Sequence, residues 1–176
     1  MKKLTLVLFG SFLILCPLMA NAASENFKYM PGDMELTLAG SGNNDEDFDA
    51  ATVSVDASLG YFLTESWEAF MRQGVGYADL EDSNRWNGST RAGIDYNFDL
   101  GAFKPFIGGN IGWVYGDEIE EQFTTGPEVG LKYFANENLF IYGMMEYGFL
   151  FSSTNEVDDN YDNGRYVYTV GIGYRW

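Results

Sequence analysis

The sequence predicts an all-β protein: an eight-stranded antiparallel up-and-down transmembrane β-barrel with short periplasmic turns and long outer loops. Three observations predict it. Eight segments alternate apolar and polar residues with a period of two, which is the pattern of strands with one apolar face. The connections between them alternate between short and long. The last segment, YVYTVGIGYRW, carries the alternation to the final residue, Trp176, where the chain of a soluble domain usually frays.

Most of the eight segments are close to the 9–11 residues that a tilted strand needs to cross the hydrocarbon layer. In chain order they cover 34–41, 52–62, 67–77, 89–98, 103–115, 125–134, 139–151 and 165–176. The short connections are 63–66, 99–102 and 135–138, and the long ones are 42–49, 78–88, 116–123 and 152–164. Short and long connections alternate when turns lie on one side of a membrane and loops on the other, and an even strand number then puts both chain ends on the turn side.

Each strand is expected to have a lipid-facing and a lumen-facing side. In the last strand the lipid-facing residues are Tyr166, Tyr168, Val170, Ile172, Tyr174 and Trp176. A soluble barrel would show the same alternation with its apolar face pointing inward, and alternation alone does not separate the two. Three features favour the membrane barrel: charges are missing from the apolar face, aromatic residues cluster near strand ends, and the polar face is rich in glycine.

Residues 1–22 have the features of a secretory signal peptide. Two lysines precede an apolar run that ends on a small-x-small site at residues 20–22. Cleavage after Ala22 would leave 23–176 as one outer-membrane β-barrel domain. The only cysteine, Cys16, lies inside the signal, so the mature chain is expected to contain no disulfide. Because a signal peptide precedes a predicted membrane-spanning barrel, we expect export to the outer membrane of a Gram-negative cell.

Composition narrows the possible functions. The formal net charge is −16, and nucleic-acid binding requires basic patches that are absent here. The sequence contains no histidine, the commonest general base and the commonest metal ligand. A Ser-His-Asp arrangement is therefore impossible. We expect a non-enzymatic protein without a cofactor.

Charged residues on the polar strand faces are expected to form an ion-pair network in the lumen. The predicted network consists of Glu35, Asp56, Arg72, Arg91, Asp95, Glu128, Lys132, Glu146, Arg165 and Arg175. An eight-stranded barrel is just wide enough to be filled by side chains, and buried charges persist only when paired. The network would then plug the barrel. Two alternatives stay open: it lines a narrow polar path, or the carboxylates of Glu128 and Glu146 perform acid–base chemistry.

Three specific contacts are expected within this network. A turn centred near Thr64 would make Asp56 and Arg72 cross-strand neighbours. Closure of the barrel would bring Glu35 and Arg175 together near the periplasmic rim. A further contact is expected diagonally between Lys132 and Glu146.

The long outer connections are strongly acidic. Their candidate cation ligands are Asp45, Asp47, Asp49, Asp117, Glu118, Glu120, Asp158 and Asp162. Ca²⁺ and Mg²⁺ prefer several carboxylate oxygens, so weak binding of either ion is one interpretation, with bridging to lipopolysaccharide phosphates. The other interpretation is a solvated, repulsive cap.

The chain resembles the small outer-membrane β-barrel proteins of Gram-negative bacteria, the OmpA/OmpX-type, porin-family-like class with eight strands. The resemblance rests on KPFIGGNIGWVYGD (104–117), GPEVGLKYFANENLFIYG (126–143) and GIGYRW (171–176). It implies that Ile172, Tyr174 and Trp176 form the signal read by the barrel-assembly machinery, and that the partners are the lipid bilayer and lipopolysaccharide. We expect a monomer.

These motifs indicate an architecture and an address rather than an activity. The leading expectation is an envelope-structural or surface-binding protein with a plugged polar lumen and acidic outer loops. A small passive channel for ions or small solutes is the first alternative. An outer-membrane enzyme acting on lipid is the second, and the absence of histidine weighs against it.

Overall fold

The computed structural model describes residues 27–44, 51–80, 83–117, 122–151 and 165–176. These residues contain eight strands: β1 (Met34–Asn44), β2 (Ala51–Phe62), β3 (Trp67–Leu80), β4 (Ser83–Asn97), β5 (Phe103–Gly116), β6 (Gln122–Phe134), β7 (Leu139–Phe151) and β8 (Arg165–Arg175). Among the described residues, no helix has the length and hydropathy needed to cross a membrane.

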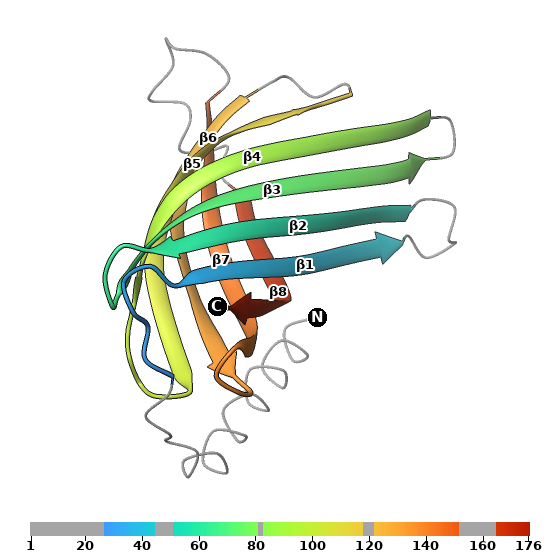
Figure 1. The fold of residues 1–176 in the computed structure, drawn as a ribbon. Coiled ribbons are helices and arrows are strands. Elements are labelled where there is room, and N and C mark those ends of the chain that lie inside the picture. The colour runs from blue at the N-terminus through green and yellow to red at the C-terminus, as the bar shows by residue number, and fades with distance from the viewer. Residues whose placement is uncertain (1–26, 45–50, 81–82, 118–121, 152–164) are drawn as a thin grey trace, which may run out of the picture.

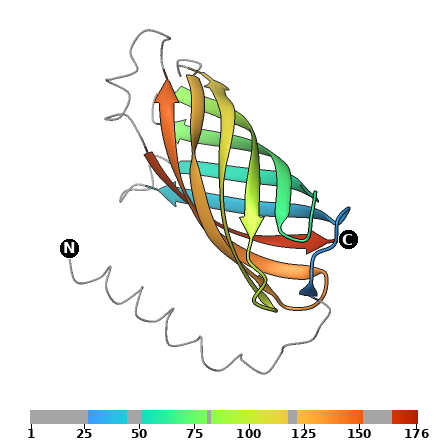
Figure 2. The same ribbon diagram turned by 90° about the vertical axis from the view of Figure 1, so that its left-hand side faces the viewer.

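The strands form one closed barrel in which each strand pairs with its neighbours in the sequence and β1 pairs with β8. All pairs are antiparallel (Figures 1 and 2). The predicted fold class is confirmed. The start of the described chain (dark blue), the C-terminus and the short turns lie at one end of the barrel, which we call the short-turn mouth (Figure 2).

Most strand boundaries agree with the sequence pattern to within one residue, but β1 continues three residues beyond the predicted end at residue 41, β6 begins three residues before the predicted start at residue 125, and the largest difference is at the second long connection. The prediction of a long loop over 78–88 is wrong, because β3 continues to Leu80, β4 begins at Ser83, and these two residues pair. Backbone hydrogen bonds between two strands can continue where neither face of the strands is apolar. Beyond the apolar belt both faces of a hairpin can be polar, so the period-two signal fades while the pairing goes on.

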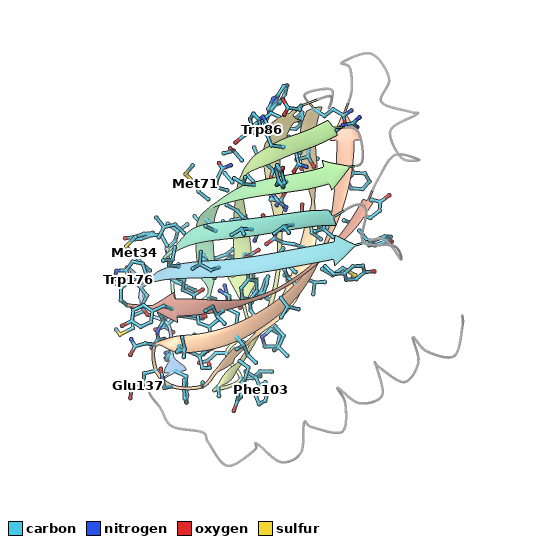
Figure 3. All side chains as sticks on the ribbon, turned by 90° about the vertical axis from the view of Figure 1, so that its right-hand side faces the viewer. Met34, Met71, Trp86, Phe103, Glu137 and Trp176 are labelled. Carbon is cyan, nitrogen blue, oxygen red and sulfur yellow. The ribbon has the colours of Figure 1, made fainter. Side chains whose placement is uncertain are left out.

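The two faces of the strands have opposite chemistry. The outer face is apolar and exposed, and Met71, which projects outward in Figure 3, has 63% of its surface accessible. Inward-facing residues are buried even when charged, as for Glu35 and Glu128. Trp67 and Tyr96 pack edge to face on the outer surface near the short-turn mouth, where aromatic rings suit a membrane–water interface.

The last residue is fixed by the closure of the barrel. The N–H of Trp176 donates to the carbonyl of Met34, and the N–H of Met34 donates to the carbonyl of Trp176, both at 3.0 Å. Below them Glu35–Ala39 pair with Gly171–Arg175. The indole of Trp176 stacks on Tyr174 at 6.2 Å between ring centroids. The chain therefore ends inside the ladder that joins its first and last strands.

Candidate functional site

The most unusual feature of the lumen is an arginine that reaches across it. Arg72 on β3 donates from Nη2 to Oε1 of Glu128 on β6 at 3.0 Å and from Nη1 to Oε2 at 3.2 Å. The two strands are three positions apart in a closed ring of eight. This two-pronged geometry is the strongest form of an arginine–carboxylate pair. It spans the interior rather than following one wall.

Two carboxylates face each other at this level. Glu128 and Glu146 are register partners in the β6–β7 pair, a position where like charges repel. The repulsion is offset by cations, because Arg72 also lies 3.6 Å from Glu146 and Arg91 lies 2.5 Å from it. Arg91 then reaches Asp56 at 3.2 Å. We call these five residues the outer cluster.

A second group of charges lies closer to the short-turn mouth. Nζ of Lys132 contacts Oε2 of Glu35 at 2.5 Å and Oε2 of Glu68 at 2.8 Å. Asn97 donates a further hydrogen bond to Glu68 at 3.2 Å. The ammonium also lies over several aromatic rings, including Phe62 at 5.5 Å. We call Lys132, Glu35 and Glu68 the inner cluster.

Asp95 lies between the two clusters. It is 4% exposed, and its Oδ1 has no hydrogen-bond partner among the described residues. It borders a cavity of about 20 Å³ that is also lined by Glu68, Lys132 and Arg72, a space sufficient for one water molecule. Gly108 leaves room for this carboxylate, since a Cβ there would lie 1.9 Å from Oδ1. Asp95 is buried as predicted for a lumen residue, but it forms none of the ion pairs within the described part of the chain.

The short-turn mouth is packed with aromatic rings. Tyr29 stacks on Phe62 with ring centroids 3.8 Å apart, and Phe134 packs against both Tyr29 and Phe27. The hydroxyl of Tyr29 donates to Oε1 of Glu35 at 2.7 Å. Burial, followed by the negative charges of Glu35 and Glu68, raises the pKa of Tyr29 well above its ordinary value. The phenol therefore remains a neutral donor at physiological pH.

Two of the three expected contacts are wrong. Asp56 lies opposite Gly74, whereas Arg72 lies opposite Ser58, so the register differs by two residues from the expected one and Asp56 pairs with Arg91 instead. A shift of two residues between paired strands leaves every side chain on the same face. The alternating pattern therefore does not distinguish one register from the other.

The other two contacts concern Lys132 and Arg175. Lys132 lies opposite Tyr142 rather than diagonal to Glu146, and it reaches across the lumen to the inner cluster. Glu35 and Arg175 are register partners, as expected. The guanidinium of Arg175, however, donates to the carbonyls of Phe27 and Lys28 at 3.3 and 3.1 Å. Arg165 is the first residue of β8, and its side chain lies outside the described part of the structure.

The sequence-based prediction omitted several residues that fill the interior, among them Lys104, Phe27 and Tyr29. Lys104 is fully buried and pairs with Asp99. It has the lumen-facing parity of its strand, which could have identified it. Phe27 and Tyr29 precede the first strand, where no periodic pattern indicates that they enter the barrel.

The acidic outer connections fall largely outside the described residues. Asp117 is exposed at the end of β5, and its carboxylate accepts a long hydrogen bond of 3.4 Å from the N–H of Trp86. The other candidates, Asp45, Asp47, Asp49, Glu118, Glu120, Asp158 and Asp162, lie outside the described residues. Within the described ranges, no group of three or more acidic, histidine or cysteine residues could hold a metal ion.

The predicted assembly residues point away from the lumen. Ile172, Tyr174 and Trp176 have 56%, 50% and 52% of their surfaces accessible on the outer face of the barrel. This placement agrees with the lipid-facing side assigned to the last strand. Their role in assembly stays a prediction.

Solved structures share this architecture at low sequence identity. The outer membrane protein OprG from Pseudomonas aeruginosa matches 85% of this chain and 98% of its own, with a TM-score of 0.58 and 13% identity. The N-terminal β-barrel domain of OprF from Pseudomonas aeruginosa matches 84% and 98%, with a TM-score of 0.54 and 15% identity. Neisserial surface protein A matches 81% and 94%, at 0.55 and 16%. No protein-family model and no curated protein matches the sequence. The chain has the fold of the small eight-stranded outer-membrane β-barrels.

Proposed function

We propose that this chain is a non-enzymatic outer-membrane protein that acts through its surface, with a lumen closed to ions and solutes. The observation that carries the proposal is the bidentate Arg72–Glu128 pair across the interior. The guanidinium of Arg72, bonded to both carboxylate oxygens of Glu128, occupies the space that a permeating ion would need. Removing either partner would leave an uncompensated buried charge. The pair therefore obstructs the lumen at this level.

Further features support the membrane location. The outer face presents apolar side chains such as Val55, Ile107 and Val170, each more than half exposed. A surface of this kind is unfavourable in water and favourable in hydrocarbon. The likeness to outer-membrane barrels agrees with it. An export signal over residues 1–22 and recognition of Trp176 during assembly belong to the same proposal.

Conductance of the purified, folded protein in a planar lipid bilayer tests the closed lumen. We expect no steady openings from the wild type. A shift in gel mobility on heating would establish beforehand that the protein is folded. Discrete openings whose amplitude changes in Arg72→Ala would instead establish the rival function, a small passive channel.

The surface role is placed at the acidic outer connections. We propose that they contact divalent cations and, through them, the phosphates of lipopolysaccharide, because clustered carboxylates suit hard cations. Mg²⁺-dependent binding to lipopolysaccharide vesicles should weaken when Asp158 and Asp162 are changed together to asparagine. Binding that is equal with and without Mg²⁺ would contradict this role.

A further inference from the structure

The segment before the first strand packs into the short-turn mouth with alternating side chains. Phe27 and Tyr29 are 8% and 2% exposed, whereas Met30 is 63% exposed and Lys28 lies at the surface in an ion pair with Glu65. Burial therefore alternates along residues 27–30. Phe27 nevertheless lies in a 3-10 turn, and the segment belongs to no strand of the barrel (Figure 2).

Side chains rather than a backbone ladder hold this segment. Arg175 donates to the carbonyl oxygens of both Phe27 and Lys28. One guanidinium therefore binds two consecutive backbone carbonyls of the segment, while the side chains of Phe27 and Tyr29 are buried in the mouth.

The pocket around Tyr29 matches the three chemical properties of its side chain. Phe62 stacks on one face of the ring with an interplanar angle of 17°. Cations lie near the ring, with Nζ of Lys104 at 5.2 Å and the guanidinium carbon of Arg175 at 5.5 Å from the centroid. Glu35 accepts the hydroxyl hydrogen bond. Stacking, cation–π attraction and a buried acceptor together select a phenol.

The segment joins the barrel through a turn in which the N–H of Asp33 donates to the carbonyl of Met30 at 3.0 Å. Gly32 has a φ of 98°, a conformation that favours glycine. The N–H of Gly32 donates to the carbonyl of Phe62, and the N–H of Phe62 donates to the carbonyl of Asp33. These bonds anchor 32–33 at the rim, whereas residues 27 and 29 are held by their side chains and by Arg175.

We propose that the short-turn mouth is a peptide-binding site for an aromatic-x-tyrosine segment, and that the chain fills it in cis with Phe27 and Tyr29 as a removable plug. The ligand class is a short peptide with two aromatic side chains separated by one residue. Peptide binding at this mouth does not require the lumen to conduct ions. It covers the inner cluster, to which Tyr29 is bonded through Glu35.

A thiol at the rim of the mouth tests this proposal. Ala102 lies in the short turn before β5, is 7% exposed and belongs to the same buried cluster as Phe27 and Tyr29, so Ala102→Cys in a Cys16→Ser background places one reporter thiol within the cluster that contains the plug. Modification by a charged, water-soluble thiol reagent should be slow. Adding Phe27→Ala and Tyr29→Ala should make it faster by roughly tenfold or more, and the matched change Met30→Ala should not.

Restoration by a peptide distinguishes a binding site from simple loss of cover. A peptide with the sequence of residues 24–31, SENFKYMP, should return the modification rate of the double variant towards that of the parent. The same peptide with alanine at both aromatic positions should have no effect. Rates that do not rise in the variants would overturn the plug, and rates that rise but are not restored by the peptide would overturn the binding site.

The single variants Phe27→Ala and Tyr29→Ala are measured alongside, so that a folding failure of the double variant leaves the test standing. Heat-dependent gel mobility identifies which variants are folded. Both single variants should raise the modification rate, and a folded Tyr29→Ala variant with the parental rate would contradict the proposal.

Discussion

Glu128 and Glu146 face each other directly in the β6–β7 pair, and Arg72 reaches both from the opposite wall of the barrel. Two adjacent buried carboxylates are unfavourable unless a cation is shared between them. The arrangement therefore makes Arg72 a residue on which the folded barrel depends.

Arg72→Ala should lower the free energy of unfolding by about 3–5 kcal/mol, because it leaves buried charge uncompensated. The double change Arg72→Ala with Glu128→Ala should cost less, since Glu146 keeps its contact with Arg91. Urea unfolding in detergent measures both. The exposed pair Lys28–Glu65 provides a control, and Lys28→Ala should cause no measurable change. Equal losses in the single and double variants would contradict the shared-cation interpretation.

A charge on the outer face tests whether that face lies in hydrocarbon. Met71 lies on β3 between the outward-facing aromatic residues Trp67 and Tyr77. Met71→Arg should destabilise the barrel in lipid vesicles by roughly 2–4 kcal/mol, as expected for arginine near the bilayer midplane. Met71→Leu is the matched control. Unchanged stability in the arginine variant would show that this face is not embedded.

Tyr29 offers a way to separate ring packing from hydrogen bonding. Tyr29→Phe keeps the stack on Phe62 but removes the bond to Glu35, and should cost about 1.5–3 kcal/mol as a hydrogen bond to a charged group. Tyr29→Ala also removes the ring, and should cost about 3–5 kcal/mol. Unfolding midpoints measured in one denaturant series compare the two. Equal effects would mean that the buried hydroxyl bond carries the whole contribution.

Asp99 gives the stability a dependence on pH. Partial burial alone would raise the pKa of Asp99, but the hydrogen bond and charge of Lys104, with the N–H of Gly101, outweigh burial and lower it below its ordinary value. A carboxyl with a depressed folded pKa stabilises the protein above its unfolded value of about 3.9 and loses that contribution as the pH falls through the folded pKa. Wild type should therefore be more stable than Asp99→Asn at pH 7, and the difference should shrink below about pH 4.

Acid titration of unfolding midpoints for both proteins checks this sign. Glu65 lies near the same rim and pairs with Lys28 at the surface, so Glu65→Gln serves as the control for a general loss of negative charge. A difference between wild type and Asp99→Asn that stays constant down to the acid limit would contradict the assignment to Asp99.

Trp176 should matter more for assembly than for stability. Trp176 is 52% exposed, and its backbone bonds to Met34 do not involve the side chain. Trp176→Ala should reduce the amount of heat-modifiable barrel in the outer membrane while leaving the unfolding midpoint of refolded protein nearly unchanged. Tyr166→Ala, on the same face of β8 and 62% exposed, controls for loss of an aromatic ring. Equal assembly defects in both variants would contradict a specific role of Trp176 in assembly.

Much of the fold could be predicted from the sequence because a lipid-facing barrel imposes a strict rule on it. Lipid outside and side chains inside force alternation with period two, and this fixed the number of strands, the faces of residues such as Val170 and Glu128, and the ends of β7. The rule applies only inside the apolar belt. It made no prediction for the end of β3, for the start of β4 or for the segment around Tyr29.

The sequence by itself determined which charges enter the lumen, and the tertiary structure decided which of them meet. Parity along a strand places Arg72, Asp56 and Lys132 inward, but a register shift of two residues preserves parity while changing every cross-strand partner. Contacts across the lumen, such as Arg72 with Glu128, join strands that are not adjacent. Their pairing follows from barrel diameter, strand tilt and side-chain reach, which are properties of the closed sheet rather than of any one segment.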